Sequence, residues 1–99
     1  MLARLTTTVL SADEPDATEE IMDNLLPTLR GLSGFQGVLV IASPKTQLIH
    51  AITLWESAEA LRENEPVMNG LRDAETTARE VVAQETGEYE VTAIHLARL

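Results

Sequence analysis

The alternation of apolar and polar positions predicts four β-strands in this chain. Residues 2–10 are rich in Leu, Thr and Val, which favour a pleated and half-buried surface. The segments "FQGVLVIA" at 35–42 and "LIHAITLW" at 48–55 have the same character, and the five residues between them suit a hairpin. The segment "YEVTAIHLA" at 89–97 is the expected fourth strand.

Two further segments have helical periodicity. Between the first two strands, apolar side chains recur at the spacing of one helix face, and the glycines of "GLSG" follow them. These apolar residues are Ile21, Met22, Leu25, Leu26 and Leu29. After the third strand, Ser57 is expected to cap a short helix. Pro66 is expected to open a longer helix over 66–86 that Gly87 ends.

The resulting order β-α-β-β-α-β is typical of the ferredoxin-like α+β fold, in which helices cover one face of an antiparallel sheet. Ninety-nine residues suit one domain, so residues 1–99 are expected to form a single ferredoxin-like domain.

The middle strands are apolar on both faces of the predicted sheet. On the third strand Ile49, Ala51 and Trp55 point to one side, and Ile52 and Leu54 point to the other. Soluble monomers rarely expose a large apolar patch. A second copy of the same sheet is the simplest cover, so we expect a homodimer.

Composition removes several classes of function. The chain has 16 acidic and seven basic residues and a net charge of −9, which disfavours nucleic acid and anionic membranes as partners. It has no Cys, which excludes disulfides and thiolate sites. Arg4 and three threonines interrupt the apolar N-terminus, and no run reaches the roughly 18 apolar residues of a membrane span. We therefore expect a cytoplasmic protein.

The motifs "GFQG" at 34–37 and "LWESAEAL" at 54–61 carry a family resemblance. With the predicted element order, they make the chain resemble the antibiotic biosynthesis monooxygenase group of dimeric α+β barrels. The resemblance covers essentially the whole chain. It implies two sheets that form a barrel, with helices outside and a pocket between helix and sheet in each subunit.

The same resemblance implies two activities. Some members of the group oxidise multi-ring phenols or anthrones with O₂ and without a cofactor, whereas others bind and degrade haem. Trp55 matches the tryptophan that lines the pocket in both. The asparagine that commonly assists it on a strand has no counterpart here, and the predicted helix 66–86 lacks the His that ligates haem iron. We therefore expect no cofactor.

Trp55 and His50 are the candidate catalytic residues. Trp55 either closes one end of the core or forms a wall on which an aromatic substrate stacks. His50 is a candidate general base, or else a hydrogen-bonded residue inside the dimer. Five positions separate the two, so they point to opposite faces of a regular strand and serve one site only if a bulge intervenes. Neither His50 nor His95 has a second ligand at metal-site spacing, so no metal is expected.

Small hydroxyls are the candidate substrate-binding groups. If Thr7 and Thr53 share the helix-facing side with Leu5 and Trp55, they orient a ligand oxygen, although threonines also simply fill strands.

The predicted long helix supplies the candidate pocket roof. Met68 and Leu71 would form that roof or pack in the core, and Arg72 or Arg79 would steady an enolate or phenolate at its mouth. Gly70 inside the helix suggests close approach of a ligand or of the sheet.

Two hypotheses follow. One is a cofactor-independent monooxygenase that acts on a small or polycyclic aromatic substrate with O₂. The other is a non-catalytic dimer that binds a small apolar ligand or assembles with a partner. Haem binding is less favoured than either.

Overall fold

The computed structural model describes residues 1–11, 17–43, 45, 47–79 and 81–97. Its elements follow the predicted order, with the second helix in two pieces. They are β1 (Leu2–Leu10), α1 (Ala17–Leu29), β2 (Phe35–Ser43), β3 (Leu48–Trp55), α2 (Ala58–Glu63), α3 (Glu65–Ala78) and β4 (Val81–Glu90). The ferredoxin-like fold is therefore confirmed. None of the described helices is long and apolar enough to cross a membrane.

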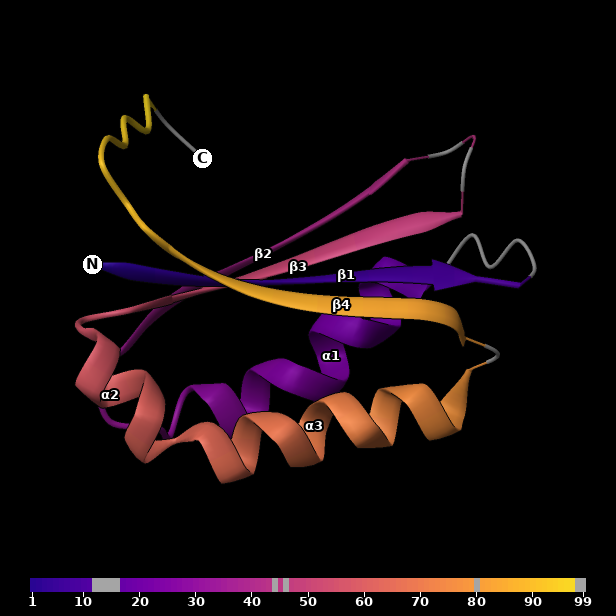
Figure 1. Ribbon diagram of the computed structural model, residues 1–99, viewed down its shortest axis with the longest axis horizontal. Coiled ribbons are helices and arrows are strands. Elements are labelled where there is room, and N and C mark those ends of the chain that lie inside the picture. The colour runs from indigo at the N-terminus through magenta and orange to yellow at the C-terminus, as the bar shows by residue number, and fades with distance from the viewer. Residues whose placement is uncertain (12–16, 44, 46, 80, 98–99) are drawn as a thin grey trace.

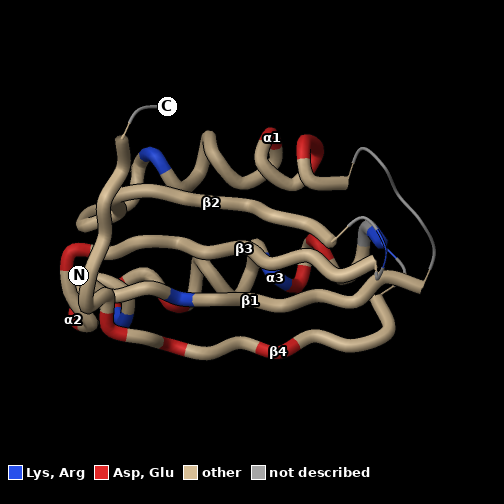
Figure 2. Tube along the Cα trace, turned by 90° about the horizontal axis from the view of Figure 1, so that it is seen from above, with Lys and Arg blue, Asp and Glu red and all other residues tan. Residues whose placement is uncertain are grey.

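One four-stranded sheet forms one layer of the molecule. Its strand order is β2-β3-β1-β4, and every neighbouring pair is antiparallel. The three helices lie on the same side of the sheet (Figure 1). In a view that faces the sheet, α3 runs behind β3 and β1, while α1 lies toward the β2 edge (Figure 2).

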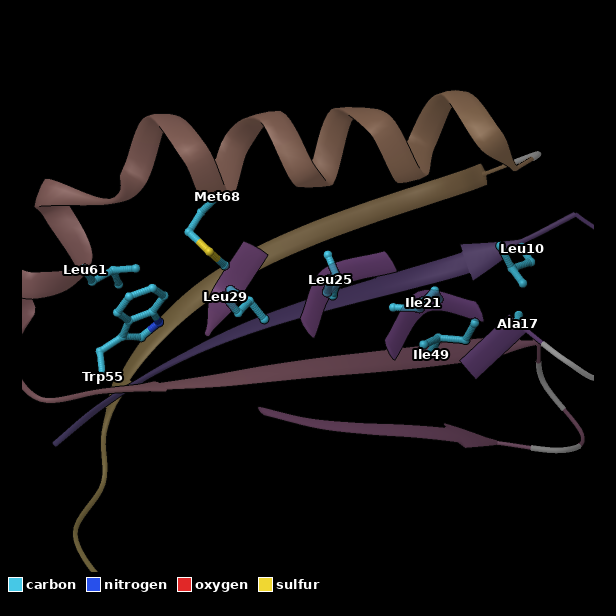
Figure 3. Packing of buried hydrophobic residues seen from close by; sticks show 9 residues of the cluster. All are labelled: Leu10, Ala17, Ile21, Leu25, Leu29, Ile49, Trp55, Leu61 and Met68. Carbon is cyan, nitrogen blue, oxygen red and sulfur yellow. The ribbon is translucent and has the colours of Figure 1, made fainter. Parts of the chain in front are cut away.

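Apolar side chains fill the space between the sheet and the helices. Helix α1 buries Ala17, Ile21, Leu25 and Leu29. The last three belong to the predicted stripe, whose other members, Met22 and Leu26, are only partly buried. The other core residues are Leu10, Ile49, Trp55, Leu61 and Met68 (Figure 3). Each such large side chain contributes about 1.5–3 kcal/mol by leaving water. Met68 is the only residue of α3 that is buried among those whose side chains are described, so this helix adds little to the core.

Gly34 directly precedes β2 and packs against α2. Its φ of 81° is in the left-handed region that favours glycine, and a Cβ there would lie 2.5 Å from the Cβ of Ala60. The Glu56 N–H donates to the Gly34 carbonyl at 2.8 Å. Next to this contact, Ser57 caps α2 as predicted, because its Oγ accepts the Ala60 N–H at 3.1 Å.

The expected boundary between the last helix and the last strand is wrong. Helix α3 ends at Ala78, not at 86, and β4 spans Val81–Glu90 instead of 89–97. Val81 and Val82 fit an apolar helical stripe, but β-branched residues also suit a strand. Pairing with a distant strand decides between helix and strand here, since β4 pairs with β1 along its whole length. Gly87 therefore lies opposite Leu5 in the sheet and ends no helix.

The strand register decides which side chains face the helices. Leu2 pairs with Trp55 and Arg4 pairs with Thr53, so the even-numbered residues of β1 share the face of Trp55. The expectation that Thr7 and Leu5 face the helices is therefore wrong, because both are odd-numbered and lie on the other face. Odd and even positions show which residues of one strand share a face. Only the pairing register shows which residues of two strands share a face.

Candidate functional site

A cavity of about 70 Å³ lies between the helix-facing side of the sheet and helices α1 and α3. Its walls are mostly apolar, with a polar stripe contributed by β1, β4 and α3. The described residues that line it are Arg4, Thr6, Thr8, Ile21, Leu25, Ile49, Ala51, Thr53, Met68, Leu71, Arg72, Glu75 and Gln84. Four predicted site residues are thus brought together, namely Thr53, Met68, Leu71 and Arg72.

Trp55 stands behind this cavity and is not among the residues that line it. Its side chain is 0% exposed and meets Phe35 edge to face, with ring centroids 5.7 Å apart. The indole Nε1–H donates to Thr53 Oγ1 at 2.9 Å. The indole therefore closes the core beside α2 and orients a hydroxyl that itself lines the cavity.

His50 lies on the opposite face of the sheet, as its five-residue distance from Trp55 predicts. Its Nδ1 is 2.9 Å from Thr7 Oγ1 on the neighbouring strand. Glu85 of β4 is the other cross-strand partner of Thr7. The structure thus joins the candidates His50 and Thr7 to each other and separates both from the cavity.

Helix α3 forms the roof of the cavity through polar contacts more than through packing. Asn69 accepts a hydrogen bond from β1, Glu75 accepts one from Asn24 at 3.3 Å, and Thr76 donates to Gln84 at 3.4 Å. Gly70 points away from the sheet, since a Cβ there would meet nothing within 4 Å. The expected close approach of the sheet at Gly70 is therefore wrong, and Gly70 is not among the residues that line the cavity.

Glu75 is a cavity residue that the sequence reasoning missed. It carries the only carboxylate among the described residues of the lining. Its Oε2 accepts the Arg79 Nε–H at 3.0 Å, and Arg79 also donates to Glu20 at 3.1 Å. Arg79 is thus held in ion pairs rather than over the cavity mouth. The four-residue spacing of Glu75 and Arg79 on one helix was the available signal.

Arg4 is the second cavity residue that was missed, and it is only 4% exposed. Its Nη2 donates to Asn69 Oδ1 at 3.1 Å, while its Nε is buried and has no partner among the described residues. Burial, followed by the nearby positive charge of Arg72, lowers the pKa of the Arg4 guanidinium, and Glu65 and Glu88 act in the opposite direction. A single cation inside an otherwise Leu- and Thr-rich strand was the signal for this group.

Comparison with known proteins identifies the fold. No protein-family model matches the sequence, and no curated protein matches it either. Solved structures do match. A monooxygenase from ActVA-Orf6 of Streptomyces coelicolor, in complex with nanaomycin D, is 18% identical with a TM-score of 0.74, over 98% of this chain and 92% of that one.

Two further structures share the arrangement. A mutant form of SnoaB, a cofactor-independent oxygenase from Streptomyces nogalater, has a TM-score of 0.73 and 14% identity, over 94% of each chain. The haem-degrader MhuD from Mycobacterium tuberculosis, with two haems in its active site, has a TM-score of 0.69 and 17% identity, over 96% of this chain and 99% of that one.

Structures described as putative antibiotic biosynthesis monooxygenases, from Deinococcus radiodurans and Nitrosomonas europaea, also match, so the resemblance seen in the sequence is confirmed at the level of the fold. Identities of this size do not select one activity, and proteins with different chemistry share the arrangement. The groups of the cavity can hold an apolar ring, orient an oxygen through Thr53 and neutralise negative charge through arginine.

Proposed function

We propose that this protein is a cofactor-independent monooxygenase that oxidises an aromatic substrate with O₂ in the cavity beneath α3. The observation that carries the proposal is the composition of that cavity. Among the described residues, its largely apolar lining includes one carboxylate, that of Glu75, together with two guanidinium groups and several hydroxyls. The solved oxygenases with this fold support the same reaction class.

The proposed reaction needs a base, an O₂ molecule and stabilisation of one negative charge. Glu75 takes a proton from a CH₂ group that lies between aromatic rings. His50 cannot serve as this base because it lies on the other face of the sheet. The carbanion transfers an electron to O₂, and the two radicals combine to a peroxide. Protonation and loss of water then convert CH₂ and O₂ into a carbonyl and H₂O. The protein contributes position and desolvation.

The size of the cavity limits the substrate in the observed conformation. A cavity of roughly 150 Å³ accommodates benzene, which is more than the 70 Å³ found here. A ligand must therefore displace part of the roof. Helix α3 buries Met68 alone among its described side chains, so its outward movement exposes little apolar surface.

Haem does not fit this site. Among the described residues, the cavity lining has no His, Cys or Tyr, and α3 carries no His. His50 is on the opposite face of the sheet. The proposed reaction therefore has no step that involves haem.

A non-catalytic ligand-binding protein is the second candidate. The observation that favours it is the position of both imidazoles, because His50 lies behind the sheet and the exposed His95 follows β4 outside any strand. This candidate predicts that aromatic ligands bind without oxygen uptake.

We also propose that the working form is a homodimer. No described element covers the sheet face opposite the helices (Figure 1), where Leu39 and Ile41 are 53% and 46% exposed. After β4 the chain leaves the sheet and exposes Ile94 and Leu96. A second sheet and this apolar arm would cover each other's exposed surface.

The dimer is tested by light scattering after size exclusion. Ile52→Glu on the uncovered face is expected to yield monomers, because a carboxylate would be buried at the interface. Val67→Glu makes the same change at an exposed position of α3 and should leave the dimer intact. A monomeric wild-type protein at micromolar concentration would refute the proposal.

Oxygen uptake tests the activity. The purified protein is mixed with a panel of naphthols, anthrones and related multi-ring phenols in an oxygen electrode, with the uncatalysed rate subtracted. Glu75→Gln is expected to lower kcat by about 10²-fold or more. Glu59→Gln, an exposed residue of α2, is the matched control and should retain activity. Uptake at the uncatalysed rate with every compound would refute the monooxygenase, and ligand binding without uptake would select the second candidate.

A further inference from the structure

Two arginines converge on the cavity, and neither forms an ion pair with Glu75, the described carboxylate of its lining, which pairs with Arg79 instead. Arg4 reaches it from β1 and Arg72 reaches it from α3. Both also line the adjoining groove beside Asn69, together with Glu65 and Glu88. No described carboxylate lies within 4 Å of an Arg4 nitrogen. Among the described carboxylates, that of its exposed neighbour Asp73 is the one that lies within 4 Å of the Arg72 guanidinium, at 3.7 Å.

The polar group without an acceptor belongs to Arg4, the more deeply buried of the two arginines. Arg4 is 4% exposed and its Nε–H is buried without an acceptor among the described residues. Removing a guanidinium from water costs free energy unless hydrogen bonds and an opposite charge compensate. Its single bond to the neutral amide of Asn69 compensates only in part. An anion that enters the cavity would supply the missing acceptor and the opposite charge.

We propose that Arg4 and Arg72 form a carboxylate-binding subsite, so that the ligand of this cavity is an aromatic carboxylate. The planar guanidinium of arginine presents parallel N–H groups that match the two oxygens of a carboxylate. The apolar walls beside it, formed by Ile49, Met68 and Leu71, accept the ring. The inference rests on the proposed function in taking the cavity as the substrate site, and it adds the charge that the substrate carries.

Titration calorimetry with a matched pair of probes tests the subsite. The probes are 2-naphthoate and the neutral 2-naphthylmethanol, which share the ring system and differ in charge. The naphthoate is expected to bind at least about 10-fold more tightly, as charged hydrogen bonds of this kind allow. Arg4→Met and Arg72→Met should each remove most of that difference and leave binding of the alcohol unchanged.

The controls separate charge from structure. Arg62→Met makes the same change on an exposed part of α2 and should not affect either probe. Arg4→Lys keeps the charge but loses the planar fork, so it should retain the fold and bind naphthoate about 10-fold more weakly than the wild type. This variant decides the matter if Arg4→Met fails to fold.

The outcomes are distinguishable from those of the oxygen assay. Neither probe has the activated CH₂ that the proposed oxidation needs, so their binding does not depend on turnover. Naphthoate preference that is lost in the arginine variants supports the subsite even if no compound consumes oxygen. Equal affinity for the two probes, or no binding of naphthoate, overturns the subsite, even if neutral anthrones are oxidised.

Discussion

The hydrogen bond between Trp55 and Thr53 gives the sharpest test of how the core supports the cavity. Both side chains are buried, and the Nε1–Oγ1 distance is 2.9 Å. Thr53→Val keeps the shape of the side chain but leaves the indole N–H without its acceptor. Leaving a buried donor unsatisfied costs about 1–3 kcal/mol. We expect the free energy of unfolding to fall by that amount.

A double-mutant cycle isolates this bond from the change in ring size. Trp55→Phe removes the donor and also leaves a gap beside Phe35. In the double variant no donor remains unsatisfied, so its destabilisation should be smaller than the sum of the two single effects by roughly 1–2 kcal/mol. Additivity within about 0.5 kcal/mol would refute the bond.

The assay is thermal and urea unfolding followed by circular dichroism. Trp55 is the only tryptophan, so its fluorescence cannot report on the variants that lack it. A loss of 1 kcal/mol lowers Tm by about 4–8 °C in a domain of this size. Protein concentration must be equal in all four samples, because any dimerisation contributes to apparent stability.

Three further variants test local features of the fold. Gly70→Ala should raise the free energy of unfolding by about 0.5–1 kcal/mol in urea titrations, because the position is helical and open; a loss would show that the glycine is needed. Gly34→Ala should lower it by about 2 kcal/mol or more, since a positive φ adds to the overlap with Ala60, and unchanged stability would contradict the turn. Met68→Ala should lower the Tm yet strengthen binding of two-ring ligands in calorimetry, because it enlarges the cavity; unchanged binding would place the ligand elsewhere.

Local patterns were sufficient for most of the elements. The stripe from Ile21 to Leu29, the cap at Ser57 and the first three strands each show in the residue pattern of one short segment. Hydrophobic periodicity and capping residues can be recognised in the amino-acid sequence itself. The same holds for the two-sided apolar character of β3, and therefore for the opposite placement of Trp55 and His50.

The last strand and the cavity depend on contacts between distant parts of the chain. The segment from Val81 suits either helix or strand, and its pairing with β1, about 80 residues away, decides between them. The register likewise turns Arg4 toward the helices and Thr7 away from them. A shift of one residue would exchange these faces.

The sequence by itself thus determined the order of elements, the fold class and four of the residues that line the cavity. Only the tertiary structure decided that Trp55 supports Thr53 from behind and that Arg4 and Glu75 line the cavity. The physical reason is that periodicity records which side chains share a face of one element. Which faces of different elements meet is set by long-range pairing and packing.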